Sequence, residues 1–304
     1  MSQDQNFGQK LQQQTIGVRL SVTSLGCRRA LEKGQIIEVA NLFEADEQSV
    51  SGSKKIINPK HELVKPIRAL LGDAKAYIRA RTIDYPEQGL RLARVDQVES
   101  LTAGIQSRKE MLSDLLDQLC AGWDSVKAEA KKRLADLYDE NDYPSSPRSH
   151  FAIYLTFPEI KPDQRLMQLN PQLYAEQQKI IQAKFEEAVV VAEAAAAKEL
   201  QQLLSNLVDK LKPGADGERK ILKGSAVANI SEFVELFKAK TIGSNAELDA
   251  LMHKVKAMAD GLDPEQLRKA AFDTREAVAN DLQGVLSEVE SLISVMPVRS
   301  IDLD

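Results

Sequence analysis

Cysteine and histidine are scarce in this sequence, and their scarcity excludes several kinds of site. The 304 residues include two cysteines, Cys27 and Cys120, which are too few for a disulfide scaffold or a cysteine-based zinc site. The three histidines, His61, His150 and His253, lie far apart, which argues against a His-rich metal centre. We therefore expect no metal site and no cofactor.

Long apolar runs are also missing. No run of about 18 apolar residues occurs, so we expect no transmembrane helix. The Gln-rich start MSQDQNFGQKLQQQ lacks the apolar core of a signal peptide. Two separated cysteines fit a reducing compartment. These features predict a soluble cytoplasmic protein with no membrane partner, in the host cytoplasm if the chain is phage-encoded.

Catalytic motifs are absent as well. The sequence has no GxxxxGK[ST] phosphate loop, and Gly72, Gly104 and Gly122 stand singly inside predicted helices. No recognisable nucleophile motif lies near any histidine, so we expect no catalytic residue and no enzyme activity. A site assembled from distant carboxylates leaves no local trace, and an enzyme of that kind stays an open alternative.

What is present is enough apolar material for a core, at 43% of residues, with apolar positions spaced for strands and helices. Alternation predicts strands at 15–23 and 151–157, and a short strand is expected at 90–95, after Pro86 and Gly89; the three should pair in one small antiparallel sheet. Spacings of three and four predict helices at 61–82, 96–138 and 172–211. The pattern of 96–138 is coiled-coil-like, and Asn170 and Pro171 mark the start of the last helix.

The two long helices, 96–138 and 172–211, have matched lengths and suggest an antiparallel hairpin. We expect Trp123 to be buried in it, opposite the Ala-rich segment 192–197. Shorter helices follow at 225–238, 244–261 and 263–295. The predicted fold class is thus α+β, mainly α, with a long helical hairpin, a small antiparallel sheet and a C-terminal group of shorter helices.

The predicted organisation has five parts. They are a disordered arm (1–14), a small α+β sheet region (15–95 plus 150–158), the long helical hairpin (96–138 and 172–211), a C-terminal helical region (218–295) and a tail (296–304). Within the sheet region, residues 44–58 are polar and are interpreted as a mobile connection.

Charge is distributed unevenly along the chain. Residues 1–82 carry a net charge of +5, although the whole chain carries −5. Within the basic stretch 54–81, four cations fall on one predicted helical face: Lys65, Arg68, Lys75 and Arg79. Such a face is a candidate binding surface for an acidic protein or for phosphate backbone. The plainer interpretation is a solvated face that balances the acidic remainder of the chain.

Two other observations bear on that choice. Only Tyr77 and Tyr85 lie near the basic face as stacking residues, so the nucleic-acid signal is weak. An acidic cluster, Asp136, Asp139, Glu140 and Asp142, follows the first long helix. It is interpreted either as a weak cation site or, more simply, as a solvated loop.

Several segments together resemble an uncharacterised domain family of tailed phages and bacteria. They are RLADLYDENDYPS (133–145), FAIYLTF (151–157), PGADGERKIL (213–222) and the late helices of 230–269. Members of that family look like companions of MoxR-type AAA+ ATPases and of cobaltochelatase-like proteins with von Willebrand A domains. Because this chain has no nucleotide-binding loop, the resemblance implies an accessory subunit rather than the motor.

The leading hypothesis is a non-enzymatic scaffold or adaptor, phage-encoded, that binds a protein partner such as an AAA+ ATPase or a von Willebrand A-domain protein. Lys65, Arg68, Lys75 and Arg79 are its candidate partner-binding residues. The alternative is a nucleic-acid-binding accessory protein that uses the same basic face. Homo-oligomerisation stays open.

Overall fold

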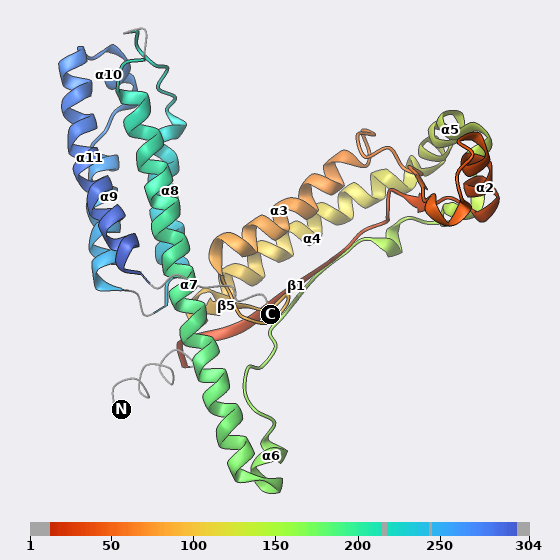
Figure 1. Cartoon of the computed structure of the whole chain (residues 1–304), viewed down its shortest axis with the longest axis horizontal. Helices are drawn as coiled ribbons and strands as arrows, with labels where there is room; N and C mark the ends of the chain where they lie inside the picture. The colour runs from red at the N-terminus through yellow and green to blue at the C-terminus, as the bar shows by residue number, and fades with distance from the viewer. Residues whose placement is uncertain (1–12, 215–217, 243–244, 297–304) are drawn as a thin grey trace. The chain divides into compact units, whose positions relative to one another are not determined.

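A computed structural model describes residues 13–214, 218–242 and 245–296. Most of these residues are helical and the strands are few and short, so the α+β, mainly α fold class is confirmed (Figure 1). The chain divides into two compact units. Unit 1 takes in the described residues within Met1–Val18, Arg79–Val98 and Phe157–Asp304, and unit 2 consists of Arg19–Ile78 and Glu99–Thr156.

The sheet is antiparallel, with the strand order β4-β5-β1-β6. The first four residues of β1 (Thr15–Thr23) pair with β5 (Arg91–Arg94) in unit 1. Its last five pair with β6 (Ala152–Thr156) in unit 2. The predicted pairing of three distant strands is thereby confirmed. β4 (Ile83–Asp84) pairs with β5 through a turn in which Gly89 has a φ of 73°.

The register of β1 places Thr15 opposite Arg94 and Arg19 opposite Thr156. At Gly17 the backbone of the 158–160 segment approaches the strand closely. A Cβ at Gly17 would stand 2.4 Å from the Pro158 carbonyl oxygen, so this position admits no side chain without a backbone shift.

Unit 2 contains most of α3 (Lys65–Arg81) and α4 (Val98–Ala121), which run antiparallel (Figure 1). Leu63, just before α3, lies against Gly122 at the end of α4, whereas Tyr77 lies against Gly104 near its start. The Tyr77 hydroxyl donates to the Ser100 carbonyl oxygen over 2.9 Å. The facing apolar stripes are buried: Ile67, Leu70, Leu71, Ala74 and Ile78 of α3, and Leu101, Ile105, Leu112, Leu116 and Leu119 of α4.

Shorter elements complete unit 2. They are β2 (Arg29–Ala30), α2 (Lys33–Leu42), η1 (Glu47–Ser49), β3 (Ser53–Lys54), α5 (Trp123–Leu134), η3 (Ala135–Leu137), η4 (Glu140–Asp142) and η5 (Arg148–His150). β2 and β3 form a separate two-stranded antiparallel ladder.

The single helix predicted over 96–138 is wrong, because the helix is interrupted at Gly122, between α4 and α5. A Cβ at Gly122 would stand 2.3 Å from Leu63 Cδ1, so the break coincides with a close approach that only glycine allows. Trp123 is buried as predicted, at 4% exposure. Its indole N–H donates to the Pro144 carbonyl oxygen over 2.9 Å, and its ring lies 6.3 Å from that of Tyr143.

Unit 1 is built around α7 (Pro171–Leu211), which begins as predicted. The Asn170 side chain accepts from the Leu173 N–H over 3.1 Å, and Pro171 occupies the first turn. The second half of α7 packs with α8 (Ser225–Lys240), α9 (Ala246–Asp260), α10 (Pro264–Lys269) and α11 (Phe272–Val295) around one large core.

The predicted hairpin of 96–138 with 172–211 is also wrong. α4 and α7 belong to different compact units, and the helix that packs along α7 is α11. Gln201 of α7 bonds to Glu290 of α11, and Lys212, just after α7, bonds to Gln283, so the two helices run antiparallel. The Ala-rich segment therefore has other neighbours than Trp123: Ala196 and Ala197 are buried in the core of unit 1.

The C-terminal group of shorter helices is present, with one more break than predicted. Asp263 caps α10 through its carboxylate, as its position before Pro264 indicates. The helix predicted over 263–295 stops at Lys269, because Ala270 and Ala271 are extended, and α11 starts at Phe272. Ser244, most of the 1–14 arm and nearly all of the 296–304 tail lie outside the described residues.

Candidate functional site

The four predicted partner-binding cations all lie on α3 and are exposed: Lys65, Arg68, Lys75 and Arg79. At 100° per residue they fall within an arc of about 80°, along about 21 Å of helix. The residues between them are small, since Ala69, Gly72 and Ala76 are exposed on the same side. A Cβ at Gly72 would contact nothing within 4 Å. We call Lys65, Arg68 and Lys75, which lie in unit 2, the basic face of α3.

Some cations of unit 2 have ion-pair partners and others, such as Lys33 and Lys132, have none among the described residues; the cations of the basic face belong to the second group. Arg108 pairs with Asp73 over 2.7 Å, Lys127 pairs with Asp124 and Glu140, and Arg148 pairs with Asp117. Lys65, Arg68 and Lys75 make no ion pair with any described residue, and Arg68 donates only to Cys27 Sγ over 3.2 Å. Direct pairing within the described chain therefore does not neutralise the face.

The two tyrosines near this face are engaged inside the protein. The Tyr77 ring is covered by the Arg108 guanidinium at 4.0 Å from its centroid, and its hydroxyl is hydrogen-bonded. Tyr85 belongs to unit 1, where it is buried against Phe185 with ring centroids 5.4 Å apart. Burial, and next the charge of Glu87, raise the pKa of Tyr85 to about 12. Neither ring is free to stack on a base.

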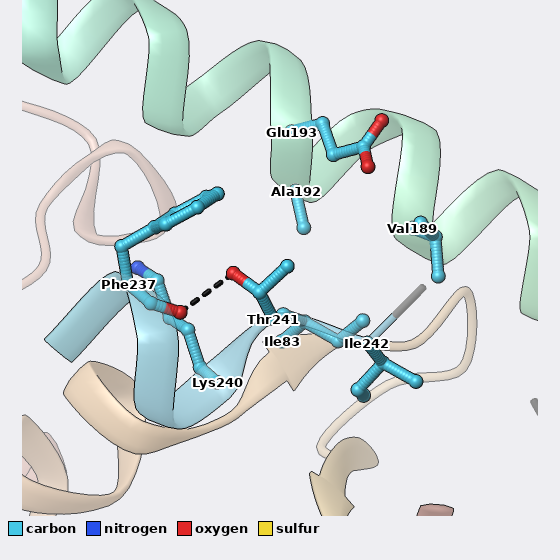
Figure 2. Close-up of a pocket in the computed structure, with 8 residues that line it drawn as sticks. All are labelled: Ile83, Val189, Ala192, Glu193, Phe237, Lys240, Thr241 and Ile242. Carbon is cyan, nitrogen blue, oxygen red and sulfur yellow. Dashed lines mark hydrogen bonds between the residues drawn. The ribbon is translucent and has the colours of Figure 1, made fainter. Parts of the chain in front are cut away.

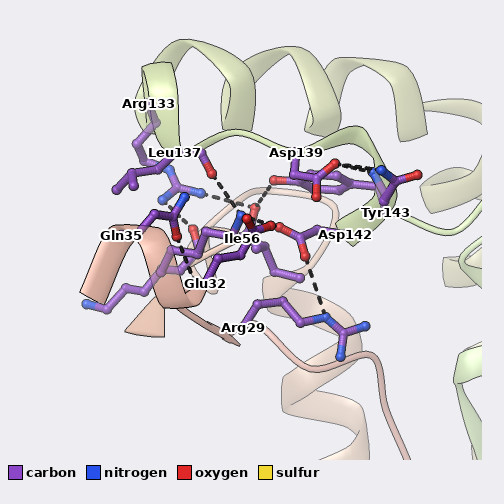
Figure 3. A network of polar contacts seen from close by, with 12 residues as sticks. Arg29, Glu32, Gln35, Ile56, Arg133, Leu137, Asp139, Asp142 and Tyr143 are labelled. Carbon is purple, nitrogen blue, oxygen red and sulfur yellow. Dashed lines mark hydrogen bonds and ion pairs between the residues drawn. The ribbon is translucent and has the colours of Figure 1, made fainter. Parts of the chain in front are cut away.

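Two carboxylates of the acidic cluster after α5, Asp142 and Glu140, are paired with cations of the protein itself; Figure 3 shows Asp142 beside Arg29. Asp142 lies 2.7 Å from the Lys54 ammonium and 4.0 Å from Arg29, and Glu140 pairs with Lys127. In residues 13–214, 218–242 and 245–296, no group of three or more His, Cys, Asp or Glu side chains is arranged to hold a metal ion.

The 44–58 segment is more ordered than the predicted mobile connection. It contains η1 and β3, and Lys54, Ile56 and Ile57 are buried. Lys54 also donates to the Leu137 carbonyl oxygen over 2.9 Å, and Ile56 accepts from the Tyr143 hydroxyl over 2.8 Å. The segment is thus fixed to the loop that follows α5, and that prediction is wrong.

His61 and the two cysteines, all in unit 2, have structural partners. His61 caps the turn before α3, because its Nδ1 accepts from the Leu63 N–H over 3.1 Å. Its Nε2 lies 3.4 Å from Glu129. Cys27 is the acceptor of the Arg68 bond, and Cys120 lies 4.0 Å from the Ser146 hydroxyl. These contacts give neither cysteine a histidine base.

Arg79 lies in unit 1, where it lines a cavity of about 440 Å³. Its walls are formed by the last turn of α3, by β4, β5 and α7, and by Lys240 at the end of α8. Sequence reasoning did not identify Lys240, because nothing along the chain links it to Arg79. A narrower slot opens beside the cavity and shares Ile83, Ala192 and Lys240 with it (Figure 2).

A second feature missed from the sequence is apolar exposure around α6 (Gln164–Leu169) and the first turns of α7. Met167 and Leu169 of α6 are 60% and 80% exposed, and Leu173 and Ile180 of α7 are 37% and 47% exposed. α6 packs on α7, but no residue of Pro171–Lys184 is buried. Apolar exposure of this extent is typical of surfaces that contact another protein.

Comparisons with known proteins add no relative. No protein-family model, curated protein or solved structure matches the chain. Among the helices described, none combines the length and the apolar character that a membrane crossing requires.

Proposed function

We propose that the protein is an adaptor that binds an acidic protein partner on the basic face of α3. The observation that carries this proposal is the placement of three exposed cations, Lys65, Arg68 and Lys75, on one face of α3, with no carboxylate of the described chain paired to any of them. Exposed, unpaired charges of one sign steer a partner of the opposite sign during association.

Two further observations support a protein partner over nucleic acid. The small side chains between the cations leave a flat surface that a helix can approach closely. Single-stranded nucleic acids are bound largely by stacking on aromatic rings, and Tyr77 and Tyr85 are both engaged internally. The apolar exposure of α6 and early α7 supports protein contacts in unit 1 as well.

The resemblance to companions of MoxR-type AAA+ ATPases supplies the first candidate partner, and the von Willebrand A-domain proteins supply the second. An accessory role beside such an ATPase is part of this proposal. It accounts for a chain that presents binding surfaces but carries no phosphate loop in its sequence.

The test is capture of purified candidate partners by the wild-type chain and by two charge-matched variants. Arg68→Glu/Lys75→Glu reverses the basic face, and Lys33→Glu/Lys132→Glu reverses two exposed lysines elsewhere in unit 2. We expect only the first variant to lose capture, with melting temperatures nearly unchanged, because exposed charges contribute little to stability.

Equal capture by both variants would refute the assignment. Salt-dependent binding of DNA or RNA that disappears in the first variant, without any captured protein, would assign the face to the nucleic-acid alternative.

A further inference from the structure

We propose that the unit 1 cavity lined by Arg79 and Lys240 binds a small phosphate monoester. This binding site is separate from the basic face of α3 and does not depend on the adaptor function. Its volume of about 440 Å³ falls in the range of small-molecule sites, which is roughly 300–1,000 Å³.

The charge of the cavity is the first argument. Three cations line it, Arg79, Arg91 and Lys240, against a single carboxylate, Asp84. The Asp84 carboxylate is paired with Arg91, so these two charges offset each other and the charges of Arg79 and Lys240 remain. The charge of Glu199 raises the pKa of Lys240, but Glu199 does not line the cavity. The excess of positive charge matches the dianion of a phosphate monoester at neutral pH.

The second argument is that two of these cations have unused donors. Arg91 is fixed, because its Nε–H donates to the Thr82 hydroxyl over 2.6 Å and another N–H donates to the Thr82 carbonyl oxygen over 3.0 Å. Arg79 and Lys240, in contrast, have no hydrogen-bond or ion-pair partner in the part of the chain that the structure describes. A guanidinium and an ammonium are both good donors to phosphate oxygens.

The third argument is the electrostatic cost of holding these cations close together without a bound anion. Lys240 is half-buried, and burial is the main cause that lowers its pKa, with Arg91 adding to it while Glu199 and Asp84 oppose it. Burial also lowers the pKa of Arg91, helped by the charge of Arg79 and opposed by Asp84. Like charges gathered in a desolvated place are unfavourable, and a compact anion among them removes that cost.

The opposite wall determines what accompanies the phosphate. It consists of small apolar side chains of α7, namely Ala188, Val191, Ala192 and Ala195. Figure 2 shows Ala192 pointing from α7 toward the segment that carries Lys240 and Thr241. The cavity is much larger than a phosphate ion, so there is space for a compact, mainly apolar body esterified to it. The concentration of the cations around Arg91 favours one compact dianion over the separated charges of a dicarboxylate.

The test is calorimetric titration of the full chain with phenyl phosphate, inorganic phosphate and succinate. We expect saturable one-to-one binding of phenyl phosphate in the sub-millimolar range, with inorganic phosphate weaker and succinate weakest. Lys240→Gln and Arg79→Gln should each weaken phenyl phosphate binding about tenfold, as loss of a charged donor does. Lys179→Gln, on the exposed part of α7, is the matched control and should change nothing.

A substitution that adds a bulky side chain to the apolar wall tests the part of the cavity that would hold the ester group. Ala195 is exposed, so Ala195→Phe should fold normally, and it should weaken phenyl phosphate more than inorganic phosphate. The Arg68→Glu/Lys75→Glu variant should bind phenyl phosphate like the wild type, which keeps this test independent of the adaptor function. The proposal is overturned if no ligand saturates, if succinate binds best, or if the Lys179 control loses as much affinity as Lys240→Gln.

Discussion

Replacing Lys54 with Met should destabilise unit 2 strongly, because Lys54 joins three segments from inside the protein. Its side chain is 2% exposed, and its ammonium lies 2.7 Å from Asp142 and 2.9 Å from the Leu137 carbonyl oxygen. Methionine fills similar space but supplies no donor. The Asp142 carboxylate, itself only 15% exposed, then keeps Arg29 as its remaining cation, at 4.0 Å and on a largely exposed side chain.

The expected loss is the sum of two effects. A carbonyl oxygen left without its donor costs about 1–3 kcal/mol. Breaking a buried ion pair by removing one partner costs about 3–5 kcal/mol in total, because the remaining charge is uncompensated. Since Arg29 compensates Asp142 in part, we expect a loss at the lower end of this sum, about 4 kcal/mol, for Lys54→Met. The double variant Lys54→Met/Asp142→Asn should recover part of it.

The assay is urea denaturation followed by tryptophan fluorescence. Trp123 is the only tryptophan of the chain and lies in unit 2, so its signal reports the unit that contains Lys54. Lys55→Met is the matched control, because Lys55 is the exposed neighbour and should lose less than about 0.5 kcal/mol. A loss below about 1 kcal/mol for Lys54→Met would refute the reasoning, as would equal losses for both variants.

Three further predictions concern the rest of the fold. Trp123→Ala should cost about 3–5 kcal/mol in denaturation followed by circular dichroism, because the ring is enclosed; a loss under about 1 kcal/mol would contradict its burial. Gly17→Ala should cost about 1–3 kcal/mol, since its Cβ would meet the Pro158 backbone, whereas Gly72→Ala, in open space on a helix, should stabilise by up to about 1 kcal/mol. Melts that rank these two variants the other way would contradict the close approach. Burial is the main cause that raises the pKa of Glu193 in the fold, so its ionisation lowers stability as pH rises through that folded pKa. Glu193→Gln should therefore be more stable than the wild type at pH 7 and equal to it below about pH 4, and melts across this range check the sign.

The strands and helix starts were predictable because their signals are local. Alternation marked β1 and β6, Pro86 and Gly89 marked the entry to β5, and the short lengths of these strands required a shared sheet. Asn170 before Pro171 and Asp263 before Pro264 marked two helix starts correctly. Each of these signals depends on backbone chemistry within a few residues, which a sequence displays directly.

Helix partners were not predictable, because an apolar stripe shows that a helix packs but not against what. The apolar stripe of 96–138 continues past Gly122 at helical spacing. Periodicity alone therefore cannot reveal the helix break at Gly122, where Leu63 packs closely against the backbone. The same limit produced the wrong pairing with α7, whose partner α11 lies far along the chain.

The burial of the Lys54 ammonium was also not predictable from the sequence. Lys54 stands in a polar stretch, and its acceptors Leu137 and Asp142 come much later in the sequence. The four cations of α3 were found from helical spacing, and all are exposed, as a candidate surface requires. That Arg79 would share a cavity with Lys240 depends on tertiary contacts, which no local pattern carries.

The most direct test of the adaptor account is the association rate constant of a purified acidic partner, measured at several salt concentrations. The account predicts that Arg68→Glu/Lys75→Glu slows association at low salt about tenfold or more, flattens its salt dependence and changes dissociation little. Lys33→Glu/Lys132→Glu, with the same change in net charge, should leave association near the wild-type rate. An equal slowing in both variants, or a change confined to dissociation, would contradict the claim that the basic face of α3 steers the partner.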